Sequence, residues 1–77
     1  MSDSPPLLDP DKLRLKRIKA RMSRPALARR AGLHPSHLSL LERGKRGTTP
    51  ETLGLLADVL GCEIEDLMPS ETKGAAA

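Results

Sequence analysis

The sequence predicts an all-α domain built from five short helices. Leucine and alanine supply most of the apolar residues, and both are good helix formers. β-Branched residues are few, and phenylalanine, tyrosine and tryptophan do not occur. Strands usually need β-branched and aromatic side chains, so this composition disfavours a sheet. Prolines and glycines also divide the chain into segments of helical length.

The size and composition of the chain limit what it can be. Its 77 residues allow one domain. The single cysteine cannot form an intramolecular disulfide, as is usual in a reducing compartment. No apolar run approaches the roughly 18 residues that span a bilayer, and the acidic, proline-rich start MSDSPPLLDPDK is unlike a signal peptide. We therefore expect a soluble, cytoplasmic protein that does not associate with membranes.

Charge is distributed unevenly along the chain, although the formal net charge is only +3. Residues 12–46 hold twelve of the thirteen basic side chains and a single acid, Glu42. Both flanking segments, 1–11 and 47–77, carry net negative charge. A solvated basic face is the plain interpretation, but the confinement of the charge to one region favours a surface that binds a polyanion.

The first helix is expected to follow a flexible leader at residues 1–8. Asp9 is an N-cap residue and Pro10 suits the first helical position, so the helix runs from Pro10 to about Arg21. Its apolar residues are available to the core at helical spacing: Leu13, Leu15, Ile18 and Met22. Leu7 and Leu8 are expected in the loose leader; packing against the domain or against a partner is the alternative.

Four further helices complete the expected domain, which spans residues 9–69 and precedes a flexible tail at 70–77. Ser23 caps the second helix and Gly32 ends it, because glycine adopts positive φ readily. The third helix begins near His34-Pro35 and stops at Gly44. Thr49-Pro50 opens the fourth, which ends at Gly61, and a short fifth covers about 64–68 before Pro69.

The segment from Ser23 to Gly44 meets the requirements of a helix-turn-helix. Ala28 and Ala31 are small enough for two helices to cross closely, and Gly32 permits a tight turn. Leu38 and Leu41 would bury one side of the following helix. The residues that then face outward are His34, Ser36, His37, Ser39 and Leu40. Such a helix fits the DNA major groove.

With these residues in order, the chain resembles the Cro and phage-repressor type of helix-turn-helix regulators, the XRE family. The resemblance covers about Leu13 to Met68 and implies a five-helix, lambda-repressor-like fold. It rests on an ordered set of matches: Arg17, Ser23, Leu27-Ala28, Ala31-Gly32-Leu33, Leu38-Ser39, Leu41-Glu42-Arg43-Gly44, Pro50-Glu51-Thr52-Leu53, Leu56-Ala57-Asp58-Val59-Leu60-Gly61 and Ile64-Glu65-Asp66-Leu67.

The resemblance implies roles for individual residues in binding double-stranded DNA. Base edges would be read at the start of the third helix, by Pro35, Ser36, Ser39 and Leu40 with His34 and His37 beside them. DNA phosphates would be bound by Arg24, Arg43, Lys45, Arg46 and Thr48. Arg24 stands where the family usually has a glutamine, and arginine binds phosphate more strongly. The family also pairs an arginine with a glutamate across the first and third helices, here Arg17 and Glu42.

The resemblance implies a sequence-specific transcription regulator that acts as a homodimer and associates with the nucleoid of a bacterium or with phage DNA. One small domain contacts one half-site, so two-fold pairing doubles the interface. The candidate dimer surface lies on the last two helices and comprises Leu55, Val59, Ile64, Leu67 and Met68. Leu40 and the shortage of arginine, asparagine and glutamine on the reading helix keep an alternative open: an adaptor or antitoxin that uses the same fold to bind protein.

No residue pattern indicates an enzyme, a metal site or a cofactor. The chain has no nucleophile beside a base and no glycine-rich phosphate loop. His34 and His37 are the only histidines, and Cys62 lies far along the chain, so zinc ligation is disfavoured. Cys62 itself is expected to be a small core residue and not a redox sensor.

Overall fold

The computed structural model describes residues 7–69, and its regular elements are helical throughout that range. Four α-helices, α1 (Pro10–Lys19), α2 (Arg24–Ala31), α3 (Pro35–Glu42) and α4 (Pro50–Leu60), are followed by the 3-10 helix η1 (Ile64–Leu67). The all-α class is confirmed. A fifth α-helix is not, because the expected last helix is this single 3-10 turn.

Side-chain caps fix where the helices begin. Asp9, Ser23 and Thr49 each accept a hydrogen bond from a backbone N–H two or three residues further on, at 3.0–3.2 Å. Each cap satisfies a donor that the first helical turn leaves without an internal partner. A proline follows every cap within the first two positions, where its missing N–H removes no helical hydrogen bond. The caps predicted from sequence therefore operate in the structure.

Two glycines with positive φ set the turns on either side of α3. Gly32 ends α2 at φ 75°, a backbone conformation that glycine adopts without strain. Gly44 has φ 72° and lies against the start of α1, where an added Cβ would come within 3.3 Å of Pro10 Cγ. A side chain at position 44 would therefore be strained by its own backbone and crowded by α1.

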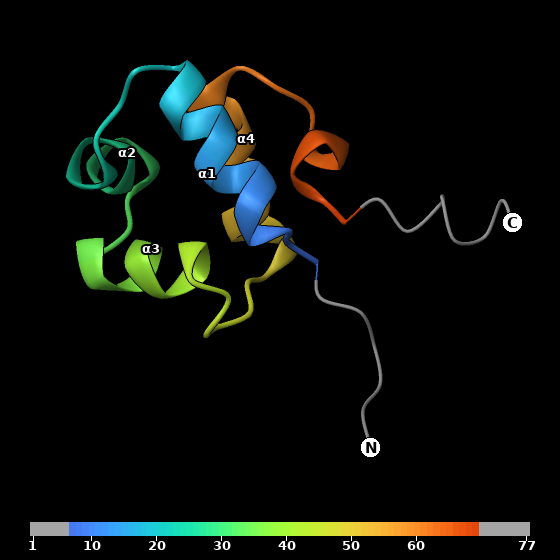
Figure 1. The fold of residues 1–77 in the computed structure, drawn as a ribbon. Coiled ribbons are helices and arrows are strands. Elements are labelled where there is room, and N and C mark those ends of the chain that lie inside the picture. The colour runs from blue at the N-terminus through green and yellow to red at the C-terminus, as the bar shows by residue number, and fades with distance from the viewer. Residues whose placement is uncertain (1–6, 70–77) are drawn as a thin grey trace, which may run out of the picture.

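The core is a cluster of leucines to which every element contributes. Fully buried leucines come from α1, α2, α3, α4 and η1: Leu13, Leu27, Leu38, Leu41, Leu53, Leu56 and Leu67. Each is worth about 1.5–3 kcal/mol relative to an exposed side chain. Ala28, Ala31 and Ala57 fill the close approaches between the helices. In Figure 1, α1 crosses in front of α4, and η1 lies beside both.

The predicted leader boundary at residue 8 is wrong. Leu8 is 4% exposed and belongs to the core, and Leu7 packs against that core. The next residue, Asp9, donates its backbone N–H to the carbonyl oxygen of Leu67 at 2.8 Å, so the segment before α1 is bound to η1. Residues 1–6 of the leader and the whole predicted tail, 70–77, lie outside the described residues.

The prediction for α1 was also wrong in part. Leu15 and Ile18 are 52% and 55% exposed, although both were expected to be available to the core. A helix turns about 100° per residue, so with Leu13 facing inward, residues 15 and 18 fall on the outer side. Leu13 is the only buried residue of α1, and Met22, beyond the end of the helix, is half-buried against the core.

Candidate nucleic-acid interface

The α2–turn–α3 unit buries one side of each helix and leaves the other side open. Leu33 follows the turn and donates its backbone N–H to the carbonyl oxygen of Ala28 at 2.8 Å, which closes the end of α2. Leu38 and Leu41 fix α3 to the core. The helix is thereby held with a fixed side towards solvent. Figure 1 shows α3 at the edge of the fold, below α2.

The outer side of α3 carries every residue predicted to read bases. His34, Pro35 and Ser36 are exposed, at the beginning of the helix. His37, Ser39 and Leu40 are half-buried. Leu40 is therefore less exposed than the sequence led us to expect, yet it is not among the side chains that pack against the core. Leu40 therefore keeps part of its apolar side chain exposed beside Ser36 and Ser39.

His34 is the N-cap of α3, a role that the sequence analysis did not assign. Its Nδ1 accepts the backbone N–H of Ser36 at 3.1 Å and lies 2.7 Å from Ser36 Oγ. Accepting from a backbone N–H requires a lone pair on Nδ1, so in the neutral ring the proton is on Nε2. The cap therefore makes Nε2 of His34 a hydrogen-bond donor. Its position directly before Pro35 was the signal in the sequence.

A groove separates the start of α2 from the outer side of α3. Arg17, Ser23 and Arg24 line one wall, and Pro35, Ser36 and Ser39 line the other. Arg24 is half exposed, with 52% of its side chain accessible. The groove thus places a predicted phosphate-binding residue beside two predicted base-reading serines.

Glu42 is 3% exposed and forms ion pairs with two residues that line this groove, Arg17 and Arg24. Arg17 donates to its carboxylate twice, from Nε at 2.7 Å and from Nη2 at 3.2 Å. Arg17 Nη1 also donates to the carbonyl oxygen of Met22 at 2.8 Å, in the turn between α1 and α2. The pair expected from the resemblance is therefore present, and it joins α1, the following turn and α3. A buried carboxylate with these partners avoids the cost of an unpaired charge.

The loop after α3 exposes Arg43, Lys45 and Arg46 but not the hydroxyl of Thr48. Thr48 Oγ1 is buried and has no hydrogen-bond partner in the described chain. The hydroxyl of Thr48 is therefore not placed to contact a backbone phosphate in this conformation. Arg43, Lys45 and Arg46 keep their charges at the surface.

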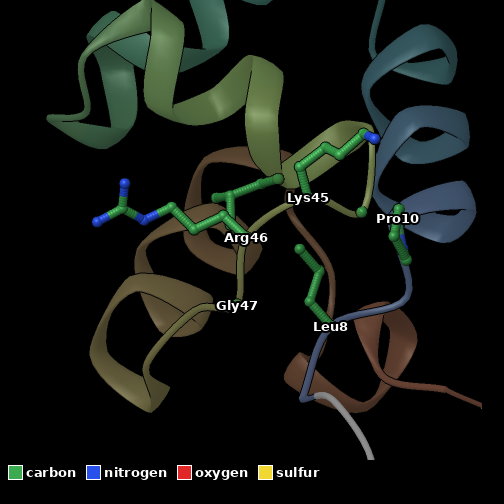
Figure 2. A pocket seen from close by; sticks show the side chains of 7 residues that line it. Leu8, Pro10, Lys45, Arg46 and Gly47 are labelled. Atoms are coloured by element: carbon green, nitrogen blue, oxygen red, sulfur yellow. The ribbon is translucent and has the colours of Figure 1, made fainter.

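Beside this loop lies a cavity of about 210 Å³ with an apolar floor. Leu8, Pro10 and Leu41 form the floor, and Lys45 and Arg46 stand at its edge. Figure 2 shows these two basic side chains extending to opposite sides of the loop. The loop can therefore present positive charge in two directions, with Lys45 extending towards α1 and Arg46 away from it.

Known proteins share this helical arrangement. A family model described as helix-turn-helix matches residues 13–67, more than half of the chain. The chain belongs to the helix-turn-helix family. The predicted resemblance to the Cro and phage-repressor type is thereby confirmed. Fold and family together support a DNA-binding transcription regulator. No curated protein sequence matches this helix-turn-helix chain.

Solved structures of two regulators and one enzyme share the fold. The restriction-modification controller protein C.AhdI from Aeromonas hydrophila is similar at 30% identity and a TM-score of 0.74, over 77% of this chain and 89% of that one. The clp gene regulator ClgR from Corynebacterium glutamicum is 30% identical with a TM-score of 0.72, over 74% and 61%. Hydroxypropylphosphonic acid epoxidase from S. wedmorenis is 34% identical with a TM-score of 0.72, over 78% of this chain but 32% of the enzyme.

The candidate dimer surface of this helix-turn-helix domain is smaller than predicted. Leu55 and Ile64 are 47% and 39% exposed, and Val59 and Met68 are half-buried. Leu67 was wrongly included, because it is fully buried in the core of its own chain and has no surface to offer a second copy. The surface that remains lies on α4, η1 and the residue after η1.

Two further findings concern metals and membranes. Within residues 7–69, no group of three or more histidine, cysteine or acidic side chains is arranged to hold a metal ion. In the same range no helix is both long and apolar enough to cross a bilayer.

Cys62 is half-buried next to the core, and burial raises the pKa of its thiol.

Proposed function

We propose that this chain is a transcription regulator that recognises double-stranded DNA by inserting α3 into the major groove. The observation that carries the proposal is the position of α3, whose polar outer side lies between two sets of exposed cations. Arg24 lies across the groove from the start of α3, and the exposed Lys45 and Arg46 follow its C-terminal end. A helix that enters a major groove meets phosphates along both of its sides.

Sequence would be read by few side chains. Ser36 and Ser39 both donate and accept hydrogen bonds, so they tolerate several bases, and Leu40 offers an apolar contact to the methyl group of thymine. Pro35 has no N–H to donate. Because the outer side of α3 lacks arginine, asparagine and glutamine, we expect modest direct readout. DNA shape and deformability would supply the rest of the specificity.

Binding strength would come mainly from phosphate contacts. Arg24, Arg43, Lys45 and Arg46 are exposed around α3 and are the proposed phosphate ligands. Five acids, in contrast, are exposed on α4 and around η1: Glu51, Asp58, Glu63, Glu65 and Asp66. This asymmetry orients the molecule, because the phosphate backbone attracts one side and repels the other.

We further propose a homodimer through the apolar residues left on α4 and η1. Leu55 and Ile64 are the most exposed of these, and Val59 and Met68 border them. Two-fold pairing would present two α3 helices to two half-sites about one turn of DNA apart, roughly 34–36 Å. Sedimentation of the chain with and without a bound duplex tests this, and a strictly monomeric 1:1 complex would contradict it.

A regulator is favoured over the alternative roles. The relatives described as a controller protein and as a gene regulator support this function, since they share the domain over 89% and 61% of their own lengths. The epoxidase shares the fold over 32% of its length, which leaves most of that enzyme without a counterpart. No observation favours the protein-binding adaptor or the antitoxin.

The proposal is tested by gel shift against genomic fragments in the presence of excess random duplex. We expect one or a few fragments to be retained when competitor abolishes binding of the others. Equal retention of every fragment at moderate salt would contradict sequence-specific regulation. For variants of the proposed phosphate ligands, Arg29→Ala is the matched control. Arg29 is exposed in the last turn of α2 and is not among those ligands.

A further inference from the structure

The buried carboxylate of Glu42 has a second cationic neighbour besides Arg17. Arg24 Nε lies 3.8 Å from Glu42 Oε1, close enough for an ion pair but too long for a hydrogen bond. This contact joins α2 to α3, whereas the Arg17 contact joins α1 to α3. One carboxylate of 3% exposure therefore lies between guanidinium groups from two other helices.

The two arginines are not equivalent. Arg17 is 13% exposed and already matches the carboxylate with two hydrogen bonds. Arg24 is 52% exposed, and within residues 7–69 its guanidinium group makes the 3.8 Å contact with Glu42 but no hydrogen bond. Two guanidinium groups and one carboxylate together carry a net positive charge. Arg24 is the more exposed of the two arginines. Glu42 thus lies beside Arg24 without neutralising both arginines.

The shape of the guanidinium group decides what Arg24 still offers. Its Nε is the atom in contact with Glu42, and Arg24 lines the groove, so the edge formed by Nη1 and Nη2 remains available to a ligand. Arginine binds phosphate well through two parallel N–H donors from such a planar edge. A lysine has a single ammonium and cannot serve Glu42 and a phosphate with two separate edges.

We propose that Glu42 is a positioning residue for DNA binding, which holds Arg24 by its Nε side so that its Nη groups meet a backbone phosphate across the groove. This inference rests on the proposed function. It assigns to Glu42 a role in affinity in addition to its pairing with Arg17. The phosphate contact at α2 is thereby coupled to the ion pair that joins α1 and α3.

The proposal makes an unusual prediction for the sign of one effect. Glu42→Gln removes a negative charge near the DNA, so simple electrostatics predicts tighter binding. A positioning role predicts weaker binding, because Arg24 loses its orientation. We expect a loss of about ten-fold, which corresponds to one charge-assisted hydrogen bond. The salt dependence should also become shallower by about 0.9, the value for one lost phosphate contact.

A double-mutant cycle separates this role from a general effect on the fold. The wild-type chain, Glu42→Gln, Arg24→Gln and the double variant are titrated with one preferred duplex, and thermal unfolding shows which remain folded. If Glu42 acts through Arg24, the double variant binds no more weakly than Arg24→Gln alone. Equal losses from Glu42→Gln in both backgrounds, or tighter binding by Glu42→Gln, would overturn the proposal.

A second comparison does not depend on Glu42 variants that fold. Arg24→Lys keeps the charge but lacks the second edge, so it should lose most of the affinity that Arg24→Gln loses; wild-type affinity in Arg24→Lys would refute the positioning role. Failure of the proposed function has a different signature. In that case the wild-type chain itself binds no duplex above random DNA, and both proposals fall together.

Discussion

The backbone N–H of Asp9 donates to the carbonyl oxygen of Leu67 at 2.8 Å and joins the start of α1 to η1. Lys12 strengthens the same junction by donating from Nζ to the carbonyl oxygen of Met68 at 2.9 Å. Between these contacts Leu8 and Leu67 are both buried. The segment before α1 is therefore an integral part of the domain that supports α2 and α3.

Replacing Leu8 should destabilise the whole domain. Leu8→Ala removes a side chain that is 4% exposed and leaves a cavity in the core, which costs about 2–5 kcal/mol. Leu7→Ala is the matched control, because Leu7 is only half-buried and should cost about 1 kcal/mol. Urea unfolding measures both. Equal, small losses would show that Leu8 does not belong to the cooperative unit.

The buried ion pair should matter far more than an exposed one on the same helix. Arg17→Ala leaves the carboxylate of Glu42 buried without its two closest donors, which costs about 3–5 kcal/mol. The exposed pair between Asp11 and Arg14, at 2.6 Å, contributes about 0–1 kcal/mol, so Asp11→Ala should be nearly neutral. Thermal or urea unfolding of the two variants decides whether burial makes this difference.

Cys62 should react slowly in the folded chain. Burial raises the pKa of its thiol, Asp66 and Glu63 act in the same direction, and Lys16 opposes them. Less thiolate is then present at neutral pH, and the thiolate is the reactive form. Alkylation by iodoacetamide at about pH 8 should be slower for the folded protein than for the protein in urea. Equal rates would contradict the raised pKa.

The same shift predicts how stability depends on pH. The raised pKa means that the folded state favours the neutral thiol, so this contribution is fully present below the pKa of the unfolded chain. It is lost as pH rises through the folded pKa. Between about pH 7 and pH 11 the unfolding free energy of the wild-type chain should fall further than that of Cys62→Ala. Parallel pH profiles would contradict the assignment.

Replacing a proposed phosphate-binding residue should change DNA binding differently from replacing a proposed base-reading residue. Lys45→Ala should weaken binding to all duplexes alike and make the salt dependence shallower by about 0.9. Leu40→Ala should instead change the ranking of duplexes that differ at thymine positions, because it removes a contact to a methyl group. Anisotropy titrations over several salt concentrations and duplexes measure both effects. A uniform loss from Leu40→Ala would mean that it supports α3 and reads no base.

Local signals in the sequence predicted most of the fold. Asp9, Ser23 and Thr49 cap helices, and Gly32 ends one, because these residues act on backbone groups within a few positions of themselves. The apolar residues of α1 were ambiguous, since Leu13 and Ile18 fall on different sides of one helix and only packing decides which is buried. The hydrophobic pattern alone does not show which of the two residues is buried.

The interface was less predictable because it depends on contacts between helices. The position of Arg24 beside Glu42 is set by how α2 crosses α3, and no spacing in the sequence specifies that angle. The buried hydroxyl of Thr48 likewise depends on the path of the loop. The outer side of α3 followed from the positions of Leu38 and Leu41, which is why the residues on that side could be predicted from sequence.

The central claim is that α3 reads DNA sequence, and selection from a random duplex pool tests it most directly. At about 0.15 M salt, where weak surface electrostatics is partly screened, the wild-type chain should enrich a shared short motif. The Ser36→Ala and Leu40→Ala variants should enrich a different motif. A wild-type pool indistinguishable from the starting pool would contradict the claim, and so would a motif that neither variant changes.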